Sequence, residues 1–303
     1  MTNTLKVVFF GQSGPFSVPA LRGLVRAKSV RFDIVAVVQG VRRPVAGETH
    51  SWSKPSRFRP RRILGGQNLC DVAVAAGIPT LRTMDVNADV VVAELEALKP
   101  DLLVCVGFHC LFGAKILALP RLFGVNVHPS MLPRWRGPSP IFWALKECEP
   151  TLGVSIHVLS PGEDTGDIFW QTEVKRPRQV SGGELYRVAA EVAVMPLLEI
   201  LSSPETLERH PQAQTEGPRA RRPSPEDLEV VPAQWGCEDL GDFMTGASYF
   251  HAVTLVIDGD RYRVKGLDRF ELGENLPGDW LEVDGLFGAR CRDGTIWVSL
   301  FDG

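Results

Sequence analysis

The sequence predicts an α/β protein in which a mostly parallel sheet has helices on both faces and a small β-barrel domain follows. The first observation is an unbroken β-rich apolar run at residues 5–10, closed by Gly11, as expected for a strand buried on both faces. The second is that such runs alternate with helically spaced apolar residues up to about residue 201. The third is a series of short alternating runs near the C-terminal end, separated by Asp-Gly and Gly-Asp turns. This pattern is typical of a Rossmann-like domain followed by an OB-like barrel.

The first domain is predicted to contain strands and helices in alternation. After the turn at residues 11–15, apolar residues recur at helical spacing from Val18 to Val25, and a second strand covers 34–38. Further helices are expected at 71–76, 90–98, 113–119 and 184–201, and further strands at 102–106, 124–128, 154–159 and 168–174. A dinucleotide site is not expected, because no third glycine follows Gly11 and Gly14 and two prolines occupy the turn and the helix start.

The composition changes after the long helix, and this change predicts the domain boundaries. Residues 203–225 are rich in Pro, Ser, Arg, Glu and Gln and lack apolar periodicity, which favours an extended linker. The predicted domains are therefore residues 1–202 and 226–303. Strands in the second domain are expected at 254–257, 262–264, 280–283 and 296–300.

Composition excludes several classes of protein. With 44% hydrophobic and 23% charged residues the chain is not disordered, and a net charge of −3 does not indicate a polyanion-binding protein as a whole. No apolar window is long enough to cross a membrane, and no signal peptide is recognisable, so we expect a cytoplasmic protein. The six cysteines have no C-x-x-C spacing, which favours reduced thiols and predicts no metal site.

Residues 124–168 concentrate polar groups that the fold alone does not require. Asn126 and His128 alternate along a predicted strand, so they point the same way at its carboxyl end, where ligands bind in open α/β sheets. Asp164 follows in a tight turn. Acyl transfer to an amine needs a donor for the developing oxyanion, a base for the amine proton and a group that orients the base, and Asn, His and Asp supply these. Singly, each residue has a structural explanation as a cap, a strand-end histidine or an Asx turn. No serine or cysteine nucleophile motif accompanies the three, which favours direct transfer.

These motifs resemble the N-formyltransferases that use 10-formyltetrahydrofolate, a family that includes methionyl-tRNA, amino-sugar and amino-acid formyltransferases. The resemblance implies that Asn126 is the oxyanion donor, that His128 takes the amine proton and that Asp164 is its partner. It also implies that two segments line the pterin slot, Val106-Gly107-Phe108 and Pro161-Gly162-Glu163. The matching residues are Asn126-x-His128-Pro129-Ser130-x-Leu132-Pro133-x-x-Arg136-Gly137, Gly153-Val154-Ser155-Ile156 and Asp164-Thr165-Gly166-Asp167-Ile168.

Departures from the tRNA enzymes bear on the acceptor. His157 resembles the pattern of sugar-amine and glycinamide ribonucleotide enzymes, whereas the tRNA enzymes have another residue there. The loop 41–63, which begins with Arg42 and Arg43, is strongly basic and suits phosphate on either a tRNA or a small molecule. We therefore assign Arg42, Arg43, Arg136 and His157 to acceptor binding. His109, at a position where the tRNA enzymes tend to have Gly, is a second departure, and either histidine has an alternative structural explanation.

The predicted function is formyl transfer from 10-formyltetrahydrofolate to a small-molecule amine, such as an amino sugar, an amino acid or a hydroxylated amino acid. The alternative acceptor is initiator methionyl-tRNA. Two further hypotheses are a non-catalytic folate- or RNA-binding module and a hydrolase that releases formate. The oligomeric state is not predicted.

Overall fold

The computed structural model describes residues 4–27, 31–43, 48–53, 68–213, 217–273 and 276–301. The chain divides into two compact units, each built from segments that are discontinuous in sequence. The first unit comprises residues 1–136, 153–173 and 186–218, and the second comprises 137–152, 174–185 and 219–303. The division at residues 202 and 226 that composition suggests stays a prediction.

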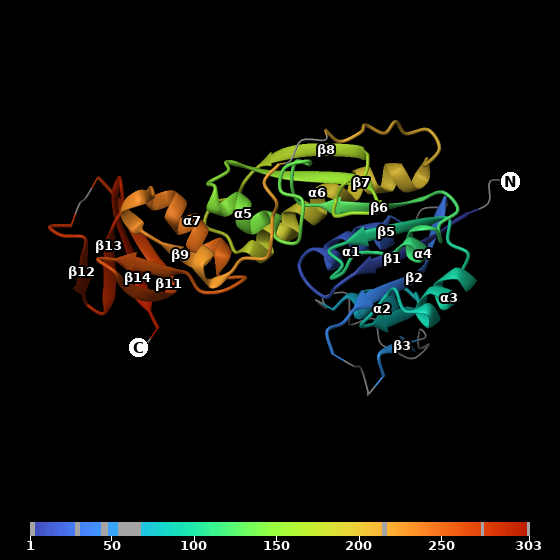
Figure 1. The fold of residues 1–303 in the computed structure, drawn as a ribbon, viewed down its shortest axis with the longest axis horizontal. Helices are drawn as coiled ribbons and strands as arrows, with labels where there is room; N and C mark the ends of the chain where they lie inside the picture. Colours follow the sequence, from blue (N-terminus) through green and yellow to red (C-terminus); the bar gives the residue numbers. More distant parts are fainter. Residues whose placement is uncertain are drawn as a thin grey trace. The chain divides into compact units, whose positions relative to one another are not determined.

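The first unit is built around an eight-stranded mixed sheet (Figure 1). Its strands lie in the order β3-β4-β2-β1-β5-β6-β7-β8. Pairing is parallel from β4 through β6, while β3 and β7 are antiparallel to their neighbours. The elements are β1 (Leu5–Gly11), α1 (Ser17–Arg26), β2 (Phe32–Gly40), β3 (His50–Ser53), α2 (Leu69–Ala75), β4 (Thr80–Thr83), α3 (Asp89–Ala97), β5 (Leu102–Val106), α4 (Ala114–Leu117), β6 (Phe123–His128), α5 (Pro140–Lys146), β7 (Thr151–Val158), β8 (Ile168–Lys175) and α6 (Gly182–Ser202).

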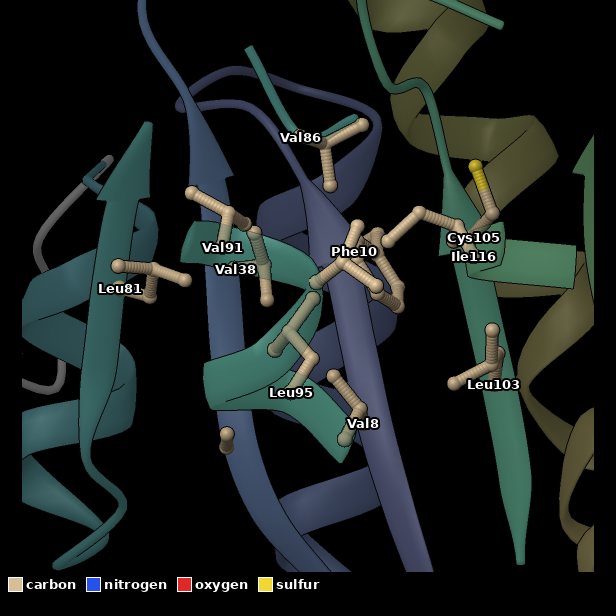
Figure 2. Packing of buried hydrophobic residues seen from close by; sticks show 12 residues of the cluster. Val8, Phe10, Val38, Leu81, Val86, Val91, Leu95, Leu103, Cys105 and Ile116 are labelled. Carbon is tan, nitrogen blue, oxygen red and sulfur yellow. The ribbon is translucent and has the colours of Figure 1, made fainter. Parts of the chain in front are cut away.

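One face of the sheet is covered by α3 and α4. Val8 and Phe10 of β1 point to this face together with Val38 of β2, and Leu95 and Ile116 come down on them from the helices (Figure 2). Because these strands are also buried on the other face, their sequence is a continuous apolar run rather than an alternating one. β5 is buried throughout as well, and such unbroken apolar runs predicted both β1 and β5 well.

The opposite face carries α1 and α6. The two helices approach closely, since a Cβ added at Gly23 would lie 2.6 Å from Val194 Cγ2. Phe16, just before α1, packs its ring 5.4 Å from that of Tyr186 in α6. The predicted fold class, a largely parallel sheet with helices on both faces and a separate C-terminal β-rich part, is confirmed.

The second unit is built on a six-stranded sheet in the order β12-β13-β14-β11-β10-β9. Two hairpins turn at Asp258-Gly259 and Asp284-Gly285, and all four residues have positive φ, as a type I′ turn requires. Next to the sheet, α5 and α7 join through an edge-to-face contact of the Phe142 and Phe243 rings. The elements are β9 (Glu229–Val230), α7 (Cys237–Ala247), β10 (Thr254–Ile257), β11 (Asp260–Leu272), β12 (Trp280–Val283), β13 (Leu286–Arg290) and β14 (Gly294–Leu300), with single 3-10 turns at Pro225–Leu228 and Pro232–Gln234.

The structure contains elements that the sequence pattern did not predict. β11 runs well beyond the expected 262–264, because register shifts between Val264 and Gly266 and between Leu267 and Arg269 break the two-residue alternation. α5 begins with Pro140 at its first turn, a helix-start signal that a Pro-rich stretch concealed. α7, β3, β4 and β13 were also missed. Among the described residues, no helix is long and apolar enough to cross a membrane.

Candidate active site

The pairing of β6 with its neighbours gathers three polar side chains on one face of the sheet. Asn126 and His128 alternate along β6, as predicted. The antiparallel register of β7 places His157 opposite Asn126 and Ser155 opposite His128. Residues directly opposite each other in a sheet share a face, so His157 joins this cluster.

Asp164 completes the cluster from the turn that connects β7 and β8. It adopts a left-handed conformation (φ 53°), which L-residues other than Asn and Asp rarely occupy. Its Oδ1 accepts a hydrogen bond from Asn126 Nδ2 (3.1 Å) and lies 3.4 Å from His157 Nε2, while its Oδ2 lies 3.5 Å from His128 Nδ1. The structure therefore brings the three residues predicted to be catalytic together, with His157 beside them.

The hydrogen bonds of His128 decide which of its nitrogens is available. Nε2 lies 2.8 Å from the Trp135 carbonyl oxygen, which only accepts, so the proton of the neutral ring is on Nε2. Nδ1 then presents a lone pair towards Asp164. Burial lowers the pKa of the His128 imidazole below its ordinary value, and the Asp164 carboxylate opposes this shift. The arrangement suits a neutral base whose imidazolium form is stabilised by an adjacent carboxylate.

His157 and Asn126 are linked by a similar argument. His157 Nδ1 lies 2.9 Å from the Val158 carbonyl oxygen and so carries the proton of the neutral ring. Its Nε2 accepts from Asn126 Nδ2 at 3.1 Å. The two amide hydrogens of Asn126 thus go to His157 and Asp164, and one of them can be redirected to a negatively charged oxygen.

The two segments predicted to line a pterin slot flank this cluster. Val106 ends β5, whose Cys105 pairs in register with Asn126. Burial raises the pKa of the Cys105 thiol to about 12, and the negative charge of Asp164 also raises it. Phe108 packs edge-on against the Phe10 ring at 5.7 Å.

Glycines give both segments their shape. Gly107 (φ 64°) and Gly162 (φ 105°) are in conformations that favour glycine, and neither places a Cβ over its peptide groups. Pro161 and Gly162 are exposed, and Glu163 is partly buried beside Asp164. Backbone groups in two such loops can hydrogen-bond the amide-like edge of a flat ring, so these residues fit a pterin.

The residues assigned to acceptor binding separate into near and far groups. His157 lies inside the cluster. Arg42 and Arg43 are exposed just after β2, three strand spacings from β6 along the sheet, or roughly 14 Å. The remaining basic residues of the loop 41–63, Lys54, Arg57, Arg59, Arg61 and Arg62, lie outside the described residues. Arg136 donates to Gln212 Oε1 from Nε (3.1 Å) and Nη2 (2.6 Å).

Gln212 is a residue that the sequence pattern missed, because it falls in the stretch expected to be a linker. It lies at the wall of a cleft of about 480 Å³ bordered by Leu132, Trp170 and His210. Only its position after a Pro could have drawn attention to it, and that signal is weak. Elsewhere in the described residues, no cluster of His, Cys, Asp or Glu is arranged to hold a metal ion.

Comparison with known proteins agrees with this geometry and defines a class of enzyme. Residues 6–201 match the model of the formyl transferase family. The match covers well over half of the chain, and the chain therefore belongs to the formyl transferase family. This confirms the resemblance seen in the sequence motifs.

Sequence relatives include methionyl-tRNA formyltransferases. That of Acidobacterium capsulatum is 30% identical over 213 residues, which are 70% of this chain and 63% of the relative. The chain thus spans less than two thirds of that protein's length. The enzyme of Acetivibrio thermocellus is 29% identical over 304 residues, covering 97% of this chain and 91% of the relative.

Solved structures share the fold at low sequence identity. HypX from Aquifex aeolicus has a TM-score of 0.64 at 17% identity over 98% of this chain and 44% of its own. The N-formyltransferase from Helicobacter canadensis, crystallised with folinic acid and dTDP-3-aminofucose, has a TM-score of 0.63 at 15% identity, over 98% and 99% of the two chains. At these identities the likeness concerns the fold.

Proposed function

We propose that this protein transfers the formyl group of 10-formyltetrahydrofolate to the amine of a small-molecule acceptor, such as an amino sugar, an amino acid or a hydroxylated amino acid. Membership of the formyl transferase family supports the formyl transfer and the folate donor. The position of His157, within hydrogen-bond distance of Asn126, supports the small acceptor.

When bound, 10-formyltetrahydrofolate supplies the carbonyl carbon that is transferred. Val106, Gly107 and Phe108 would hold the pterin from the end of β5, and Pro161, Gly162 and Glu163 would hold it from the turn before Asp164. Both segments offer backbone donors and acceptors next to the cluster, which suits a ring with an amide-like edge.

The chain's own groups can carry out the transfer by direct attack. Asn126 Nδ2 turns one hydrogen from His157 or Asp164 to the oxygen on which negative charge develops, and such a donor contributes about 3 kcal/mol to catalysis. His128 Nδ1 accepts the amine proton. Asp164 then stabilises the imidazolium through its Oδ2. The imidazolium can pass its proton to the leaving nitrogen of the folate as the bond from that nitrogen to the formyl carbon breaks, which would release tetrahydrofolate.

The acceptor assignment depends on His157. His157, one of the positions at which the sequence motifs depart from those of the tRNA enzymes, lies within the cluster and not on the surface, with its side chain 2% exposed. There it can meet only the reacting part of an acceptor. Arg42 and Arg43, roughly 14 Å away along the sheet, can meet a phosphate on the same acceptor only if the acceptor is extended, as a nucleotide-linked sugar is.

A turnover screen tests this proposal. Tetrahydrofolate release is followed with nucleotide-linked amino sugars, hydroxyornithine-like amines and charged initiator methionyl-tRNA. We expect turnover with a small amine, lost in His157→Leu while folate affinity is retained. Turnover with the tRNA alone would overturn the acceptor, and release of formate without an acceptor would indicate a hydrolase.

Initiator methionyl-tRNA is the second candidate acceptor. The observation that favours it is the alignment with methionyl-tRNA formyltransferases over almost the whole chain, including the second unit. Under this proposal Arg42 and Arg43 contact the acceptor stem. The same screen decides between the two acceptors, because each is tested separately. Repeating it at several salt concentrations adds a second criterion, since turnover with tRNA should fall steeply as the salt concentration rises.

A further inference from the structure

The segment after α6 returns to the sheet instead of leaving the first unit. His210 pairs with Ile168 at the start of β8 through two backbone hydrogen bonds, from Ile168 N to His210 O (2.8 Å) and from His210 N to Ile168 O (2.9 Å). Two residues later, Gln212 is 8% exposed. A glutamine buried to this degree needs partners for its amide oxygen and both amide hydrogens.

The partners of Gln212 are on the turn that carries Asp164 and on the loop after β6. Its Nε2 donates to the Asp164 carbonyl oxygen (2.9 Å) and to the Gly166 carbonyl oxygen (2.7 Å). Its Oε1 accepts two hydrogen bonds from the Arg136 guanidinium. The side chain therefore spans the turn on both sides of Thr165 and ties it to Arg136.

These bonds close a ring around the proposed base. Arg136 follows Trp135, whose carbonyl oxygen accepts from His128 Nε2, and Asp164 faces His128 Nδ1. From His128 the ring passes through Trp135, Arg136, Gln212 and Asp164 back to His128. All five residues belong to the first unit. Both nitrogens of the imidazole are thereby positioned by one connected set of contacts.

We propose that Gln212 is a positioning residue for formyl transfer, which holds the Asp164 carboxylate against His128 Nδ1 by fixing the backbone of residues 164 and 166. The inference rests on the proposed role of His128 as the base. The left-handed conformation of Asp164 sets the direction of its carboxylate, and the hydrogen bonds of Gln212 to the carbonyl oxygens of residues 164 and 166 hold the backbone on both sides of Thr165.

The state of His128 is the property through which Gln212 acts. The charged or titratable groups that face His128 are Asp164, Glu163 and His157: the two carboxylates raise its pKa, whereas His157 and burial lower it. If the turn is released, the Asp164 carboxylate moves away from Nδ1. The pKa of His128 then falls further, and the imidazolium that forms during transfer loses its partner.

The experiment uses Gln212→Met, which keeps the volume of the side chain and removes its hydrogen bonds. The titration of His128 is followed by ¹⁵N-imidazole NMR in the ligand-free full chain, assigned with His128→Gln. We expect His128 to titrate at a lower pH than in the wild type. With an acceptor, kcat falls about 10- to 100-fold while KM for the folate changes less than about twofold, because only the reacting groups lose alignment.

Gln171→Met is the matched control. Gln171 also borders the cleft and donates two hydrogen bonds from Nε2, but to Leu132 and Ser155 instead of the Asp164 turn. Its loss should leave the His128 titration at the wild-type position. If loss of either glutamine acted only by loosening the unit, His128 would titrate alike in Gln212→Met and Gln171→Met.

An unchanged His128 titration in folded Gln212→Met would overturn the proposal. If Gln212→Met does not fold, Arg136→Met releases the other end of the same side chain, and it must shift the titration in the same direction. Because the NMR titration needs no substrate, it decides the role of Gln212 even if no acceptor is turned over, a result that would count against the proposed function alone.

Discussion

Asp242 in the second unit and Asp164 in the first both lie among polar partners, but Asp242 is buried and Asp164 only partly buried, and their surroundings differ. In the second unit, the Asp242 side chain is 1% exposed and accepts hydrogen bonds from Arg176 Nη1 (2.9 Å) and the Gln179 backbone N–H (2.7 Å). Arg178 Nε forms an ion pair with the same carboxylate at 3.0 Å. In the first, Asp164 faces Asn126 and two histidines. Arginine keeps its charge at any physiological pH, whereas histidine gains and loses a proton near neutrality.

The difference shows what each cluster is suited to do. Two hydrogen-bond donors and the ion pair with Arg178 give the Asp242 carboxylate partners whose charge does not change, so this cluster holds Val174–Leu185 against α7 within the second unit. Asp164, by contrast, faces His128, whose side chain can gain or lose a proton. A buried acid beside arginine is costly to unpair, whereas an acid beside histidine is able to support proton transfer.

The largest effect is expected from removing the base. His128→Ala should lower turnover by about 100- to 10,000-fold, because a positioned base contributes that much, while folate affinity stays unchanged. Steady-state kinetics and a folate titration measure the two quantities. Turnover within tenfold of the wild type would show that the cluster in the first unit is structural, like the one in the second.

Breaking the arginine cluster should affect folding. Asp242→Ala leaves Arg176 buried without its carboxylate, and we expect a loss of about 3–5 kcal/mol in the free energy of unfolding. Urea denaturation measures it. Asp89→Ala is the control, since its pair with Lys115 is exposed and screened by solvent, so its loss should leave the free energy of unfolding nearly unchanged. Similar decreases in the free energy of unfolding of Asp242→Ala and Asp89→Ala would contradict the structural role of the buried cluster.

The pH dependence sharpens the comparison. His128 must be neutral to accept a proton, so turnover should fall as the pH drops through its lowered pKa. Asp164→Asn removes the charge that opposes the lowering, so this acid limb should move to lower pH, with kcat about 10- to 100-fold smaller and a lesser effect on folate affinity. An acid limb that moves to higher pH, or an equal loss of folate affinity, would contradict the assigned role of Asp164.

The same shift has a consequence for stability. Because the pKa of His128 is lower in the folded protein, the unfolded chain binds the proton more readily below about pH 6.5, the ordinary histidine value. The free energy of unfolding should therefore decrease as the pH falls through this range, and less so in His128→Gln. Denaturant titrations between pH 5 and pH 8, a range set by histidine chemistry, measure the difference.

The smallest effect is expected on the exposed edge of the second unit. Trp280 of β12 is 44% exposed and stacks on Phe287 at 5.3 Å. Trp280→Ser should cost about 1 kcal/mol of stability, the usual contribution of an aromatic pair, and leave folate affinity unchanged. A change in folate affinity would mean that the second unit takes part in donor binding.

The sequence alone determined the local features of this protein. Unbroken apolar runs fixed β1 and β5, and the two-residue period along β6 placed Asn126 and His128 on one face, because both signals depend on neighbouring residues. Motif spacing was specific enough to identify the family.

The tertiary structure decided which other residues lie beside Asn126, His128 and Asp164. His157 meets Asn126 across 31 residues of sequence, and Gln212 meets the Asp164 turn across 48 and Arg136 across 76. No periodicity encodes contacts of this range, since they depend on the register of β6 with β7 and on the return of the chain to β8. For that reason the stretch 203–225, whose composition favours a linker, contains the residue that holds the proposed catalytic carboxylate in place.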